Sequence, residues 1–310
     1  MLAVGGGMAM MIRTNLAAPG GQFITPQVYN TLVGIHGITM IVAMIIVATG
    51  PFGNFIMPIM IGAADMAFPR LNALSWWVLF TAIPVLCSSW FLGGVPIGWT
   101  AYAPLSVQAG PGENAYIATI IIFAVSTAVA GANITATVVT MRAKGMTWNR
   151  VPIFVIGATI SVALAIPAFP TFMLSQIMTA MDRSFGTVFF DSHHGGSGWL
   201  YAHLFWIMGH PEVYVILLPG VAILMEIVPV FARRPLFSYT TAVVGFAGIA
   251  GLSILVWAHH MYISGWMPML NGPFMITTEM ISIPTGLIFL VILGTIWGGR
   301  PWLKVPMLGV

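Results

Sequence analysis

The sequence predicts an all-α, polytopic transmembrane helix bundle. Of its 310 residues, 59% are hydrophobic and only 5% are charged, whereas soluble domains carry about 25% charged residues. The apolar residues form runs long enough to cross a bilayer, separated by turns rich in proline, glycine or charge. We therefore expect an integral membrane protein, surrounded by the lipid bilayer and without a nucleic-acid partner.

The lengths of these runs predict about seven full spans and a partial first helix. The apolar run at 1–12 is predicted to be the tail of a spanning helix, because no basic region precedes it as in a signal peptide. No linker or repeat divides the chain, so a single membrane domain over 1–310 is expected. The full spans are predicted at 31–61, 75–95, 115–141, 152–178, 200–230, 238–263 and 274–298.

The distribution of basic residues predicts the orientation. If successive loops alternate between the two sides, eight of the ten Lys and Arg residues fall on one side and Arg13 and Arg183 on the other. This split fits the positive-inside rule. The side that carries Asp65 and Arg70 is therefore expected to face the cytoplasm, or the matrix in a mitochondrion.

The stretch at 206–219 places three protonatable side chains, His210, Glu212 and Tyr214, inside an apolar run. An ionisable side chain at bilayer depth costs roughly 2.5 kcal/mol or more and usually marks an ion, proton or ligand site. Residues four apart share a helix face, so His210 and Tyr214 are expected side by side. Glu212 is expected to point about 160° away around the axis.

Three histidines form a candidate metal site. His259 and His260 are adjacent, so on a helix their side chains diverge by about 100° and can share an ion only with a third ligand, which His210 can supply. Three imidazoles with an open position suit copper or zinc. With one cysteine, Cys87, a thiolate cluster is excluded. The alternative is a structural polar cluster.

The remaining histidines are less specific. His193 and His194 lie in a Gly/Ser loop and are expected to be solvated. His36 lies between Gly34 and Gly37 at the outer end of its predicted span, where small neighbours would let a flat ligand approach. A hydrogen bond from His36 to a neighbouring helix is the alternative.

Long motifs in order along nearly the whole chain resemble subunit I of the haem-copper oxidases, the cytochrome c oxidase family. They lie at 12–13, 53–54, 65–72 (DMAFPRLN), 98–100, 189–191, 201–206 (YAHLFW), 209–214 (GHPEVY), 257–261 (WAHHM) and 283–286 (IPTG). The resemblance implies a terminal respiratory oxidase that reduces O2 to water at a haem–copper centre, coupled to proton translocation.

The resemblance also implies the metal ligands. His210, His259 and His260 match the three ligands of copper B, and Tyr214 matches the tyrosine cross-linked to the first of them. His36 matches an axial ligand of the low-spin haem iron. The complete subunit of the family holds two haems, and the proximal ligand of the second lies outside this chain.

Further positions are implied for haem contact and proton transfer. Arg13 and Trp99 match residues that hydrogen-bond the low-spin haem, although a snorkelling arginine and an interfacial tryptophan are the alternatives. Glu212 matches the end of the proton-input path and Asp65 its entrance. The amides along that path correspond to Asn54, Asn72 and Asn133, and Thr285 remains from a second path.

The chain also departs from the family pattern. Ile288 replaces the lysine of the second proton path, and Glu279, about two turns earlier, is expected to face water or another subunit. Asn15 replaces an acid that helps to bind a peripheral cation. The resemblance covers roughly helices one to eight of about twelve, so we expect a fragment or half of a split subunit, inactive alone.

Two other functions are considered. A nitric oxide reductase of the same superfamily would suit the missing lysine, and a proton channel or transporter would explain the intramembrane acids. As an oxidase subunit, the chain would assemble with subunits of type II and III and receive electrons from cytochrome c or quinol. Its membrane would be the bacterial plasma membrane or the mitochondrial inner membrane.

Overall fold

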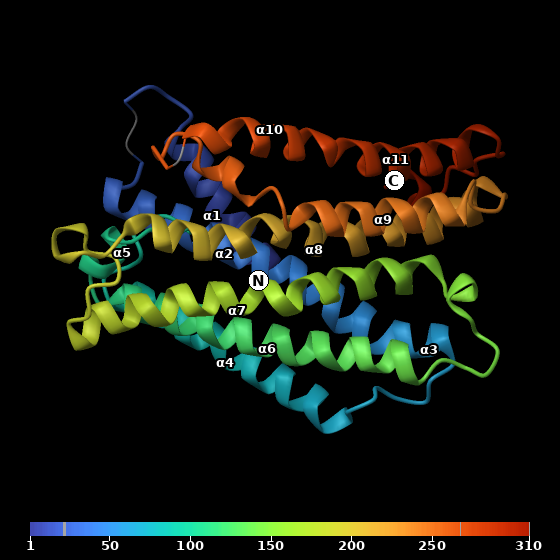
Figure 1. The fold of residues 1–310 in the computed structure, drawn as a ribbon, viewed down its shortest axis with the longest axis horizontal. Helices are drawn as coiled ribbons and strands as arrows, with labels where there is room; N and C mark the ends of the chain where they lie inside the picture. The colour runs from blue at the N-terminus through green and yellow to red at the C-terminus, as the bar shows by residue number, and fades with distance from the viewer. Residues whose placement is uncertain (21–22, 267, 310) are drawn as a thin grey trace. The chain divides into compact units, whose positions relative to one another are not determined.

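The structure is a computed structural model that describes residues 1–20, 23–266 and 268–309. Across these ranges the chain is helical and contains no strand (Figure 1), which confirms the all-α class. The longer helices are α1 (Leu2–Asn15), α2 (Pro26–Val47), α4 (Pro69–Phe91), α6 (Gly112–Thr140), α7 (Ile153–Phe185), α8 (Gly198–Ala232), α9 (Tyr239–Ser253), α10 (Asn271–Met280) and α11 (Ser282–Trp297). The short ones are the π-helix η1 (Ala48–Ile56), α3 (Met57–Ile61), α5 (Leu105–Gln108), α12 (Val305–Leu308) and the 3₁₀ helices η2 (Trp148–Arg150), η3 (Ser192–His194), η4 (Trp257–Met261) and η5 (Pro268–Leu270).

Six segments of the described chain are long and apolar enough to cross a membrane. They are Pro26–Ile45, Pro69–Phe91, Gly112–Thr140, Ile153–Phe185, Gly198–Ala232 and Pro268–Trp297. Six of the seven predicted full spans are thus found among the described residues, and two predicted segments differ in their bounds. The span predicted at 31–61 begins at Pro26 and changes to a π-helix at Ala48, and the span predicted at 238–263 ends at Ser253.

Both corrections fall where the apolar pattern is interrupted by a residue type or by a tertiary contact. The sequence of η1 includes a proline, Pro51, and a proline has no N–H to donate to an α-helix. After α9, the carbonyl of Leu255 accepts a hydrogen bond from Thr277 Oγ1 of α10 at 3.2 Å. Thr277 thus contacts the backbone just after α9, at a position where the apolar pattern predicts that the α-helix continues.

The described residues form two compact units. Unit 1 comprises Met1–Val47, Ala73–Ala128 and Phe169–Phe205, and unit 2 comprises Ala48–Asn72, Val129–Ala168 and Trp206–Val310. In unit 1, α1 packs against α2, and Gly5 permits the close approach because a Cβ there would lie 2.5 Å from Sδ of Met40. The prediction of one membrane domain over 1–310 stays a prediction.

In unit 2, a proline in α8 creates a link to α7. Pro219 has no N–H, so the carbonyl of Val215, four residues earlier, lacks its usual helical donor. Ser161 Oγ of α7 donates to this carbonyl at 2.7 Å. Elsewhere in the unit, α9 and α11 lie side by side (Figure 1), and a Cβ at Gly245 of α9 would lie 2.7 Å from Cγ1 of Ile288 on α11.

Candidate metal centre

Three histidines of unit 2 converge. One ring nitrogen each from His210, His259 and His260 lies within 4.8 Å of the others, as the sequence predicts. Nδ1 of His210 is 3.4 Å from Nε2 of His260, and the ring centroids of His210 and His259 are 4.5 Å apart. His210 is buried at 6% exposure, and its Nε2 has no hydrogen-bond partner among the described residues.

The backbone at the adjacent pair differs from the prediction. His259 and His260 lie in the 3₁₀ helix η4, not within a long α-helix, because α9 ends at Ser253. The two rings lie close together, with centroids 4.3 Å apart and an angle of 50° between the planes. The predicted divergence of about 100° assumed an α-helix and stays a prediction.

Two neighbours fix the orientation of these rings. His259 Nδ1 is 2.9 Å from Thr278 Oγ1 on α10, which leaves Nε2 of His259 to act as the ligand atom. His260 stacks on the indole of Trp206, with centroids 3.7 Å apart and planes 3° from parallel. Sequence reasoning missed Thr278, because nothing in a separation of 19 residues reveals this contact.

Tyr214 lies beside the cluster. Its ring centroid is 4.9 Å from that of His210, one helical turn earlier on α8, which confirms the predicted shared face. Glu212, between them in sequence, is 4% exposed within the same helix. The candidate centre thus combines three imidazole nitrogens with a phenol ring beside one of the imidazoles.

His36 lies in unit 1, in the middle of α2 and not at the outer end of its span, since α2 begins at Pro26. Its Nδ1 is 2.9 Å from the carbonyl of Gly5 on α1. Because the carbonyl accepts, Nδ1 carries the proton and Nε2 keeps a free lone pair that could bind a metal.

The glycines beside His36 have a different role from the predicted one. A Cβ at Gly34 would lie 2.9 Å from the carbonyl oxygen of Val95, and one at Gly37 would lie 2.9 Å from Cβ of Trp99. They let the loop at 95–99 approach α2, so the expectation that they leave space for a flat ligand is wrong. Trp99 therefore lies next to the turn that carries His36, whereas Arg13 is exposed in the last turn of α1.

Some of the predicted proton-path residues lie together in unit 2. Asp65 is exposed in the loop before α4, and its Oδ1 accepts the N–H of Met66 at 2.7 Å. Asn133 of α6 is buried, and its Oδ1 accepts the N–H of Phe68 in the same loop at 2.9 Å. Asn54 lies in η1 and Asn72 in the first turn of α4.

The position of the missing lysine, Ile288, is buried and packed. Ile288 is 2% exposed and packs against α9 at Gly245. Thr285, one turn earlier on α11, donates from Oγ1 to the carbonyl of Ile281 at 2.8 Å. Glu279 is exposed near the end of α10, and its contact with water or another subunit stays a prediction.

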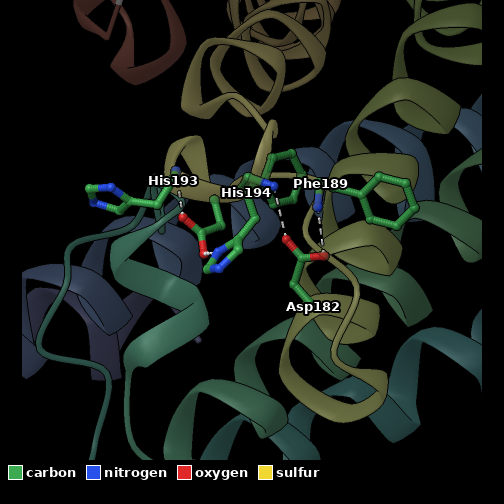
Figure 2. Close-up of polar contacts among 6 residues, drawn as sticks. Asp182, Phe189, His193 and His194 are labelled. Atoms are coloured by element: carbon green, nitrogen blue, oxygen red, sulfur yellow. Dashed lines mark hydrogen bonds and ion pairs between the residues drawn. The ribbon is translucent and has the colours of Figure 1, made fainter.

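The loop histidines of unit 1 are exposed, as predicted. Figure 2 shows their imidazoles pointing in different directions, so they do not form a shared ligand pair. His194 Nδ1 lies 2.6 Å from Asp191 Oδ2, and this hydrogen bond, with one from the backbone N–H of His193, holds the pKa of Asp191 below its ordinary value. Asp182 accepts the N–H groups of Phe189 and Phe190 at 3.0 Å each (Figure 2), which anchors the loop to α7.

Comparisons with known proteins place the sequence of this chain in one family. Residues 1–310 match the family described as Cytochrome C and Quinol oxidase polypeptide I. Cytochrome c oxidase subunit 1 of Bacillus subtilis (strain 168) is 42% identical over 307 residues, which are 98% of this chain and 49% of the relative. The subunit of the same name from Synechocystis sp. is 38% identical over 306 residues, 98% of this chain and 56% of the relative.

Quinol oxidase subunit 1 of Bacillus spizizenii is 40% identical over 312 residues, 99% of this chain and 48% of the relative. The chain thus spans about half the length of these relatives. Together with six apolar helices, these matches make it an integral, multi-pass membrane protein. The chain belongs to the cytochrome c and quinol oxidase polypeptide I family.

Proposed function

We propose that this chain is part of the catalytic subunit of a terminal respiratory oxidase that reduces O2 to water and couples the reaction to proton translocation. One observation carries the proposal: three histidine nitrogens within 4.8 Å of one another, with the ring of Tyr214 against His210. Membership of the family gives this cluster its chemical context.

The donor set fits copper. Neutral imidazole nitrogens suit copper or zinc better than magnesium or calcium, which prefer oxygen. Nε2 of His210 is buried and has no hydrogen-bond partner in the described chain. A bound metal would satisfy this nitrogen atom. Bound copper, together with a haem, would provide the redox chemistry for O2 reduction. Among the two metals, the family favours copper B.

The residues around the histidines have supporting roles. Thr278 fixes the ring of His259 through Nδ1, and Trp206 fixes the plane of His260 by stacking. Such contacts keep ligands in place and typically change metal affinity by about 10- to 100-fold. Tyr214 carries a phenolic proton beside His210, and we assign it the role of a local proton and electron donor.

A low-spin haem is proposed at His36. The hydrogen bond from Nδ1 to the carbonyl of Gly5 leaves Nε2 as the ligand atom, which fits an axial histidine. A haem in this position would carry electrons to the haem–copper pair. Trp99, which packs on Gly37, supports contact with the haem periphery, and Arg13 is proposed for the same periphery.

The proposed proton path begins at Asp65 and ends at Glu212. Two of its amides have buried polar atoms without a partner in the described residues, Oδ1 of Asn54 and Nδ2 of Asn133. Such atoms favour bound water, which a proton path needs. Asn72 is proposed as a further member. The packed side chain of Ile288 argues against a second path beyond Thr285.

The electron donor and partner subunits follow the family. Relatives named as cytochrome c oxidase and as quinol oxidase match at 42% and 40% identity, so cytochrome c and quinol are both proposed as donor classes. The complete enzyme would include subunits of type II and III. A proton channel without cofactors would not require three converging histidines. A nitric oxide reductase would suit the missing lysine at Ile288, but the relatives are named as cytochrome c and quinol oxidases and do not favour it.

The experiment is a turnover assay on the complete enzyme, with O2 uptake measured against reduced cytochrome c and against quinol. The proposal requires O2 uptake with one of these donors, together with a reduced-minus-oxidised spectrum of bound haem. Reduction of nitric oxide without O2 uptake would instead identify the nitric oxide reductase. If the purified protein contained neither haem nor copper, the proton channel or transporter would be the remaining function.

A further inference from the structure

A fully buried carboxyl in unit 1 has no role in the proposed site. Glu113 is the second residue of α6 and is 1% exposed. Both of its carboxyl oxygens are buried and accept no hydrogen bond from the described residues. A buried carboxylate without donors is strongly unfavourable, so the group must bind a proton, water or a cation.

The neighbouring cation does not supply the missing hydrogen bonds. Arg183, in the last turn of α7, lies within electrostatic range of Glu113. Its Nε donates to Asn114 Oδ1 at 2.7 Å. Its terminal nitrogens donate to the carbonyl oxygens of Ser106, Val107, Ala109 and Gly110. The guanidinium is thus committed to the loop before α6, and no ion pair with Glu113 occurs in the described chain.

Two further oxygen atoms of unit 1 are also buried without a hydrogen-bond partner among the described residues. They are Ser106 Oγ and Gln176 Oε1. Gln176 Nε2 donates to Tyr201 Oη at 2.9 Å, and Tyr201 Oη donates to the carbonyl of Thr100 at 2.8 Å.

These groups are connected to Glu113. Tyr201 is within electrostatic range of it, and Ser106 is bound by Arg183 through its carbonyl. Arg183 and Tyr201 thus link three residues, from α5, α6 and α7, whose buried oxygen atoms lack partners among the described residues.

We propose that Glu113 is a proton-binding site. The neutral carboxyl donates a hydrogen bond to bound water, which in turn donates hydrogen bonds to the free oxygens of Ser106 and Gln176. On release the proton passes to that water, leaving a carboxylate within the field of Arg183. The charged and titratable groups that face it are Arg183 from α7 and Tyr201 from α8. No redox partner is needed for this exchange.

In one respect the inference rests on the proposed function. The predicted topology puts the loop before α6 on the side opposite the Lys- and Arg-rich loops. In an enzyme that moves protons outward, Glu113 would accept them on the output side. The sequence gives little sign of this, because Glu113 stands two residues before the predicted span at 115–141.

The test is infrared spectroscopy of the complete enzyme with the Glu113→Gln variant. We expect a carbonyl-stretch band of a protonated carboxylic acid that shifts in heavy water and is lost in Glu113→Gln. The matched control, Glu279→Gln, changes an exposed carboxyl and should keep the band. If Glu113→Gln does not fold, Gln176→Leu provides a second readout, because loss of the bridged amide should shift the band.

Identical bands in wild type and Glu113→Gln would overturn the inference. A band that emerges only after Na⁺ or Ca²⁺ is removed would also overturn it, in favour of a cation site. Proton release during O2 uptake tests the output role: fewer protons per electron are expected in Glu113→Gln. An enzyme without O2 uptake refutes the proposed function alone, whereas normal uptake with an unchanged band refutes only this inference.

Discussion

Thr278 Oγ1 lies 2.9 Å from Nδ1 of His259, so a residue of α10 sets the orientation of His259, a proposed copper ligand on η4. The contact joins two segments that are 19 residues apart. It also fixes which nitrogen of His259 faces the other two histidines. The cluster therefore depends on the end of α9 being unwound, since η4 and α10 contact each other there.

The first prediction concerns this hydrogen bond. Thr278→Val keeps the shape of the side chain and removes the hydroxyl, so the ring of His259 loses its anchor. We expect copper affinity in the complete enzyme to fall by about 10- to 100-fold. Competition with a chelator measures this loss. Thr159→Val is the matched control, because Thr159 donates to the carbonyl of Val155 within α7 and belongs to neither η4 nor α10; equal losses in both variants would contradict the assignment.

The second prediction concerns Tyr214. Tyr214→Phe keeps the ring against His210 but removes the phenolic proton. O2 reduction should be lost while copper and both haem spectra remain. Tyr239→Phe serves as the control, since Tyr239 Oη donates to the backbone carbonyls of Trp148 and Val151 and not to a histidine. Full turnover of Tyr214→Phe would remove the phenol from the reaction.

The third prediction concerns Ile288. Ile288→Lys, which restores the family residue, should not open a second proton path, because the side chain is buried against Gly245. A lysine there costs about 2.5–3.5 kcal/mol at bilayer depth and has no space for water. Thermal inactivation in detergent should occur at a lower temperature, whereas Ile288→Met should behave as wild type. A stable and faster enzyme with lysine would mean that the position is hydrated.

The fourth prediction concerns the proline in α8. Ser161→Ala leaves the carbonyl of Val215 buried without a donor, because Pro219 cannot supply one. The loss should be about 1–3 kcal/mol of stability. Thr159→Val on the same helix is the control, since Thr159 bonds the carbonyl of Val155, which already has a helical donor. Thermal unfolding of both variants compares them, and equal midpoints would refute the explanation.

The helical class was predictable because apolar runs of span length have few alternatives in a membrane. The end of α9 was not, since the hydrogen bond from Thr277 to Leu255 depends on tertiary contact. The histidine cluster was predictable from residue type, because imidazoles at bilayer depth are costly without a role. The function of Gly34 and Gly37 was misjudged, because a small residue signals close approach but not what approaches.

The central claim is that His210, His259 and His260 together hold copper in a haem-copper oxidase. The most direct measurement is the copper and iron content of the complete subunit, purified as wild type and with each of the three histidines changed to alanine. We predict that each variant loses copper and O2 reduction but keeps the low-spin haem spectrum, which His36→Ala should abolish instead. Copper retained at the wild-type ratio in any one of the three variants would contradict the claim.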